Sequence, residues 1–297
     1  MSRVLILILS LVSLAGFVSA SAQTSDVNAQ IQKATSAFVE APSTSTRAAL
    51  VSELSAYQGP PTVQSINGHL SLLMYDAPSE DFPLILPTAR AATAHLEPVA
   101  DRLPKQYLDA RFIAAVAAFN AEKDENAAYE MAHIQGMALG IEPDGVWPDW
   151  AKSTHYQAKA WALAMLADLK ADRRKSVSQD TFDEILAAYP ARKENQTASD
   201  ALSLCEGKIR NRSRIQYPSL ATRRGQWGAL ILEYDLNAEG RVINETVAAA
   251  VPEGFFEEES LEWVKKGRFR PKKPDEAGIN CRIERRGIVQ DLVFQLR

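Results

Sequence analysis

The hydrophobic period of this 297-residue chain changes once, near residue 208, and that change limits the folds open to it. From about Asp26 to Lys208, apolar residues recur every three or four positions, which is the spacing of amphipathic helices. After residue 215 they alternate with polar residues, as in strands that bury one face. The chain is therefore expected to be α+β, with an all-α part first and a small strand-rich part second.

The first part contains eight segments with helical spacing. Gly59-Pro60-Pro61, Pro143-Asp144-Gly145 and Pro190 separate some of them, because a helix does not continue through such positions. The expected helices cover residues 26–40, 46–57, 88–101, 105–122, 126–139, 151–173, 179–189 and 198–209. Antiparallel helix pairs of this size resemble a tetratricopeptide-like stack, although no repeat of that family's length is found. Within residues 59–87, Leu70 to Tyr75 is either a short strand or a buried turn of helix.

The second part has the order β-β-α-β-β. Its first strand alternates apolar and polar residues up to Leu236, and a turn at Gly240 leads into a second strand over 241–249. A short helix follows over 257–266, with glutamates at its first turn and lysines at its last, which suits the helix dipole. A closing hairpin is expected from 279–284 and 288–297, turning at Arg285-Arg286-Gly287. In its second strand Leu292, Phe294 and Leu296 share one face, and Asp291, Val293, Gln295 and Arg297 share the other.

The first 22 residues are typical of a signal peptide. Arg3 precedes an apolar run that ends at Val18, and the small residues Ser19 to Ala22 predict cleavage before Gln23. The alternative is an uncleaved anchor, since the run is only slightly shorter than a membrane span. After cleavage, the mature chain would comprise a helical domain, 23–208, and a second domain, 209–297, in the periplasm.

Two cysteines, Cys205 and Cys281, would meet an oxidising compartment after export. They either form the one possible intramolecular disulfide or remain buried free thiols.

Motifs of catalysis and of metal binding are missing from the sequence. There is no Gly-x-Ser-x-Gly, phosphate-binding glycine loop, Cys-x-x-Cys or His-Glu-x-x-His. Glu130-x-x-His133 has the spacing of di-iron bundles, but no second copy occurs, and His69, His95 and His155 lie far from it in sequence. We therefore expect neither an enzyme nor a cofactor or metal.

Residues 216–271 carry a string of turn, aromatic and charged positions that resembles the TonB C-terminal domain. The matching positions are Gln216-Tyr217-Pro218, Ala221, Gly228, Glu239-Gly240-Arg241-Val242, Asn244, Pro252, Phe256-Glu257 and Arg268-Phe269-x-Pro271. Their order and spacing agree with the family without a gap. The resemblance assigns residues from about 209 to 297 to this fold.

The resemblance implies energy-coupled transmembrane transport in the bacterial envelope. TonB-like domains bind an extended segment of an outer-membrane TonB-dependent transporter as an added strand beside their C-terminal strand. The residues that the resemblance places at this site are Gln216, Tyr217, Pro218, Val289, Asp291, Val293, Gln295 and Arg297. The alternative is that the chain itself or a homodimer covers this edge.

The chain also departs from the energy-transducing members of the family. Those members have an N-terminal helix with a histidine that meets an inner-membrane proton-channel complex, followed by a proline-rich spacer. Residues 4–20 contain no histidine, and a helical domain replaces the spacer. Contact with the proton-channel complex would require the anchored form. The second interpretation is a non-energised periplasmic adaptor or scaffold in envelope assembly, with the helical domain as its main partner-binding part.

The net charge of −4 gives no indication of nucleic-acid binding. Residues 205–297 hold 17 Lys and Arg against 14 Asp and Glu, so the second part is slightly basic and the first is acidic. A basic cluster, Lys208, Arg210, Arg212 and Arg214, precedes the matching string. It is interpreted as a solvated linker face, with acidic groups of a transporter or of lipids as the alternative partner.

Overall fold

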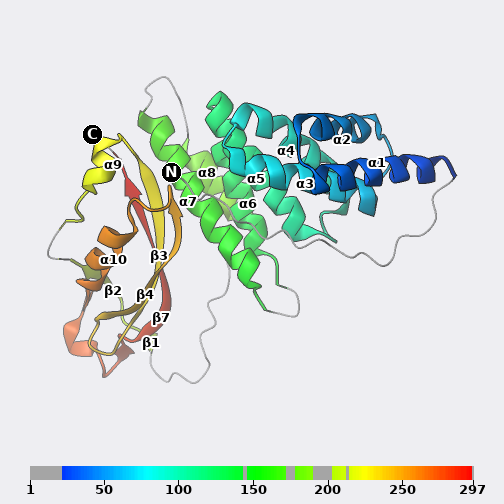
Figure 1. Ribbon diagram of the computed structural model, residues 1–297. Coiled ribbons are helices and arrows are strands. Elements are labelled where there is room, and N and C mark those ends of the chain that lie inside the picture. Colours follow the sequence, from blue (N-terminus) through cyan, green and yellow to red (C-terminus); the bar gives the residue numbers. More distant parts are fainter. Residues whose placement is uncertain (1–21, 143–145, 172–177, 190–202, 212–213, 296–297) are drawn as a thin grey trace. The chain divides into compact units, whose positions relative to one another are not determined.

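The computed structural model describes residues 22–142, 146–171, 178–189, 203–211 and 214–295 (Figure 1). All but the last residue of the predicted signal peptide therefore lies outside the described residues. The contacts form two compact units, one ending at Glu130 and the other beginning at Met131. This division differs from the predicted domain boundary at 208/209, which marks the change of secondary structure and remains a prediction.

The first unit is built of helices, as the sequence predicts. They are α1 (Ala22–Glu40), α2 (Thr44–Ala56), α3 (Val63–Asp76), α4 (Phe82–Leu96), α5 (Pro104–Glu122) and the start of α6 (Asn126–Leu139), with 3-10 turns η1 (Ala77–Ser79) and η2 (Glu97–Val99). Ile31 and Phe38 of α1 pack with Leu50 and Leu54 of α2 and Leu72 of α3 in one apolar cluster.

The segment that the sequence left open, residues 59–87, contains a helix. α3 begins because Thr62 and Ser65 form a reciprocal cap, in which each side chain bonds the other's backbone N–H. α4 begins at Phe82, six residues before the predicted start. The Asp81 carboxylate accepts a hydrogen bond from the Leu84 N–H, and Pro83 lies in the first turn, where no partner for its nitrogen is needed.

The second unit combines helices with short strands. Beyond α6 it contains α7 (Asp149–Ala171), α8 (Gln179–Ala187), β1 (Ser203–Leu204), β2 (Gly207–Arg210), α9 (Ser219–Arg223), β3 (Gly228–Leu236), β4 (Val242–Val251), α10 (Glu257–Lys265), β5 (Arg268–Pro271), η4 (Pro274–Glu276), β6 (Cys281–Arg282) and β7 (Arg285–Phe294). The α+β fold class is confirmed.

The described strands form three sheets. β4, β3 and β7 make an antiparallel sheet in that order, β2 pairs with β5, and β1 pairs with β6. The predicted closing hairpin is wrong, since residues 285–287 begin β7 and β7 pairs with β3. The predicted helix over 198–209 is wrong over its described residues, where 203–204 and 207–209 are strand. Gly207 suits the strand, because a Cβ there would lie 2.4 Å from the Arg270 carbonyl oxygen.

Helices cover both faces of the three-stranded sheet (Figure 1). On one face, Leu230, Leu232 and Tyr234 join a core with Val264 of α10. On the other face, Ala229, Ile231, Ala249 and Val251 pack against Tyr156, Ala160 and Ala164 of α7. The sequence predicted one buried face for β3. In the structure, α7 also buries the second face over the first half of β3.

Candidate peptide-docking edge

β7 forms a regular outer edge of the sheet. Its pairing with β3 continues through seven successive positions, from Ile288 opposite Tyr234 to Phe294 opposite Gly228. No strand among the described residues pairs with its other side. Alternate residues of such a strand therefore direct their N–H and C=O groups away from the sheet. A row of this kind is a template for another extended chain.

The opposite edge, β4, is irregular. Its pairing with β3 shifts register twice, between Ile231 and Leu232 and between Glu233 and Asp235. Asn244 in β4 has a positive φ of 56°. Bulges and local twist interrupt an edge for a second strand. Of the two edges of this sheet, β7 is the better suited to an added strand.

The side chains of β7 that the resemblance singled out share the face toward α7. Val289 and Val293 are 38% and 45% exposed, so an added strand would cover apolar surface. Between them, the Asp291 carboxylate forms an ion pair with the Lys159 ammonium of α7, at 2.8 Å. Gln295 is exposed just beyond the end of β7. Arg297 and Leu296 lie outside the described residues.

Tyr217 connects the family segment to the end of β7. Its ring makes edge contacts with Phe256 and Phe294, each at 5.8 Å between centroids, and its hydroxyl donates to the Gln226 carbonyl. Burial raises the pKa of the Tyr217 phenol. Pro218 is buried and Gln216 is exposed. The structure thus brings Tyr217 to β7 through Phe294.

Two groups near the edge were missed by sequence reasoning. Lys159 comes from α7, whose apolar stripe predicted a neighbour but not its identity. The Tyr234 hydroxyl donates to the Gln290 side-chain oxygen of β7 at 3.0 Å. Burial raises the pKa of Tyr234 to about 12, with a smaller opposing effect of Arg285, so this donor stays protonated at neutral pH.

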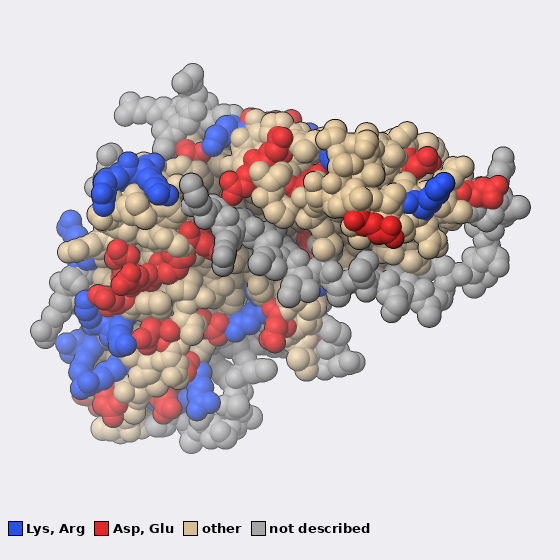
Figure 2. All heavy atoms as spheres, in the orientation of Figure 1, with Lys and Arg blue, Asp and Glu red and all other residues tan. Residues whose placement is uncertain are grey.

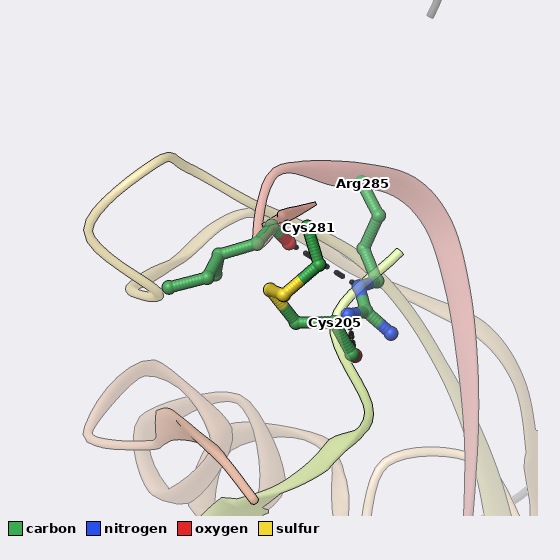
Figure 3. The surroundings of a disulfide bond; sticks show 4 residues. Cys205, Cys281 and Arg285 are labelled. Atoms are coloured by element: carbon green, nitrogen blue, oxygen red, sulfur yellow. Dashed lines mark hydrogen bonds between the residues drawn. A yellow bond between two sulfur atoms is a disulfide. The ribbon is translucent and has the colours of Figure 1, made fainter. Parts of the chain in front are cut away.

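A disulfide lies at the start of β7 (Figure 3). The sulfur atoms of Cys205 and Cys281 are 2.07 Å apart, which joins the segment between β1 and β2 to β6. Arg285 donates from Nη2 to the Cys205 carbonyl at 2.8 Å and lies over the Phe269 ring at 4.5 Å. These contacts anchor the first residue of β7.

The residues of the Glu-x-x-His motif have separate partners. Glu130 forms an ion pair with Arg111, and His133 Nδ1 lies 3.1 Å from the Tyr189 hydroxyl. No group of three or more His, Cys, Asp or Glu that could hold a metal occurs among the residues that the structure describes.

Taken together, these features define an α+β unit with helices on both faces of its main sheet and an edge strand, β7, that has no outer partner among the described residues. Residues 213–287 match the sequence model of the Gram-negative bacterial TonB protein C-terminal family, so the predicted resemblance is confirmed. The match ends near the start of β7 and does not include most of the edge. No curated protein matches the chain.

The match covers about a quarter of the chain and concerns this domain alone. Residues 213–287 are therefore similar to the TonB C-terminal domain, a domain of envelope-associated transport proteins. Across the described ranges, no helix combines the length and apolar character needed to cross a bilayer.

Proposed function

We propose that this protein binds an extended segment of an outer-membrane TonB-dependent transporter as a fourth strand beside β7, in the periplasm. The observation that carries the proposal is the regular outer edge of β7 over residues 288–294, with which no described strand pairs. Main-chain N–H and C=O groups of the guest would pair with those of β7 and supply affinity. Alternate side chains of the guest would contact the two faces and supply selectivity.

The two faces of the edge differ in chemistry. Toward α7, a guest strand would lie beside Val289, Val293 and the Lys159–Asp291 ion pair. Toward α10, it would lie beside Ile288 and Leu292, which are partly buried against the core. The guest is therefore a segment with apolar side chains on both faces and a polar one near Asp291.

Site-specific photocrosslinking tests this assignment. A crosslinking amino acid at Val293 should capture a TonB-dependent transporter in cells. The matched control is Ile243, an apolar residue of the other edge strand that is 39% exposed. Capture from Val293 and not from Ile243 supports docking on β7. Equal capture from both positions, or none from Val293, contradicts it.

The second candidate is a non-energised adaptor in envelope assembly. It is favoured by the packing of α7 directly on the sheet, where Lys152 and Lys159 pair with Glu233 and Asp291, each at 2.8 Å. A helix held on the domain in this way does not act as an extended spacer across the periplasm. A crosslinker at Val39 of α1, which is 59% exposed, distinguishes the two. The adaptor predicts capture of a non-transporter protein there and no capture from Val293.

A further inference from the structure

The β2–β5 ribbon carries positive charges on one face. Lys208 lies opposite Arg270, and Arg210 lies opposite Arg268. All four side chains are exposed. Opposite residues in antiparallel strands direct their side chains to the same face, as do alternate residues along each strand. The residues between them, Ile209 and Phe269, face the core instead.

A fifth cation extends this face. Arg241 forms an isolated antiparallel bridge with Arg268 and is exposed. We refer to Lys208, Arg210, Arg241, Arg268 and Arg270 as the cationic ribbon. Figure 2 shows Lys and Arg side chains gathered at the lower left of the view, around the region where Figure 1 labels β2.

The cationic ribbon is not neutralised within the described part of the chain. No described carboxylate forms an ion pair with any of its five residues, whereas the nearby Lys272 pairs with Glu206 at 2.9 Å. Like charges directly opposite one another destabilise a strand pair. The five cations therefore repel one another in the folded protein, and an anionic partner would reduce this repulsion.

We propose that the cationic ribbon binds anionic phospholipid headgroups at a membrane surface. The Cβ atoms of opposite residues lie ~5 Å apart and those of alternate residues along one strand ~7 Å apart, so the side chains can contact several phosphates at once. Four of the five residues are arginine, whose planar guanidinium binds phosphate oxygens in pairs. No aromatic residue occurs among them, as the stacking of nucleic-acid bases would require.

An exposed apolar side chain on the segment that the disulfide joins to the residues before β2 supports a lipid surface over an acidic protein. Ile279 is 71% exposed and lies two residues before Cys281. Cys281 is bonded to Cys205, three residues before Lys208. A basic surface and an exposed aliphatic residue are features that peripheral membrane proteins combine. This inference does not depend on docking at β7.

Vesicle co-sedimentation of the mature chain, residues 23–297, tests the proposal. The probes are vesicles of phosphatidylcholine alone and vesicles with about a third phosphatidylglycerol, at low and high salt. Binding is expected only to the anionic vesicles at low salt. Arg268→Glu with Arg270→Glu should lower the partition coefficient at least about tenfold. The matched control, Arg223→Glu with Arg224→Glu at the C-terminal end of α9, makes the same change in net charge, and its partition coefficient should stay within about twofold of the wild type.

Circular dichroism confirms that both double variants are folded. Absence of binding by the wild-type chain to anionic vesicles overturns the proposal, as does an equal loss in both double variants, which would reflect net charge alone. Retention on a polyglutamate resin that depends on Arg268 and Arg270, without vesicle binding, would also overturn it and assign the ribbon to an acidic protein. Loss of binding in the ribbon variant alone supports it.

Discussion

Phe294, the last residue of β7, has its side chain in the core. It is 4% exposed, and its ring stacks on Phe256 at 4.3 Å and meets Tyr217 at its edge. Phe294→Asp would bury an unpaired charge and remove these ring contacts, so we expect it to lower the free energy of unfolding by about 3 to 5 kcal/mol. Urea unfolding measures the change. The neighbour Val293→Asp, on an exposed position, should cost less than about 1 kcal/mol, and equal effects would mean that the strand faces are reversed.

His69 makes the helical unit sensitive to acid. Burial, with a smaller effect of His95, lowers the pKa of His69 to about 4, and the two rings are 4.7 Å apart. The unfolded chain therefore binds this proton first as pH falls. The contribution of neutral His69 to the free energy of unfolding is fully present above about pH 6.5. It is lost progressively down to about pH 4, by roughly 3 kcal/mol. Urea unfolding at pH 7 and pH 4.5 should show the loss in the wild type and a smaller one in His69→Gln. The same pH dependence in both proteins would contradict the assignment.

Single residues were predictable where local geometry decides them. The alternation of Leu292 with Asp291 and Val293 gives the correct faces of β7, because a strand has a period of two. The ion pair between Asp291 and Lys159 was not predictable, since it joins residues far apart in sequence. The partners of Tyr217 likewise depend on how three separate segments pack.

Among the elements, the segment around β6 depends on the disulfide. It joins residues 76 apart, so its removal frees a long loop in the unfolded chain. Cys205→Ser with Cys281→Ser should lower the free energy of unfolding by about 4 kcal/mol. Thermal unfolding of the double variant, and of the wild type with and without reductant, measures this. No difference among these samples would show that the bond contributes nothing to folding.

Elements were predicted best where their signals are local and worst where partners are distant. Most helices of the first unit follow from apolar spacing and from stops such as Gly59-Pro60-Pro61. β1 and β2 were mistaken for helix because they pair with β6 and β5, whose paired residues lie 58 to 78 positions later, from 268 − 210 to 281 − 203. The prediction of a closing hairpin was wrong for the same reason, since β7 pairs with β3 and not with β6, the strand before it in sequence.

At the scale of the whole molecule, α7 belongs with the sheet. Ala229, Ile231, Ala249 and Val251 are buried by α7, so a fragment without it would expose them. We expect residues 203–297 to aggregate or to unfold at lower urea concentration than residues 146–297, since both fragments keep the two cysteines. Sedimentation velocity and urea unfolding compare them. Equal solubility and stability would instead favour an independent domain close to the boundary predicted at 208/209.

The most direct test of the proposed docking is amide hydrogen exchange, measured residue by residue in the mature chain with and without a purified TonB-dependent transporter. In the free protein, alternate amides of residues 288–294 should exchange rapidly, because half of them have no partner in the sheet. With the transporter these amides should become protected, while those on the outer side of β4 stay unchanged. Uniform protection along β7 in the free protein, or no change in β7 on binding, would contradict the account.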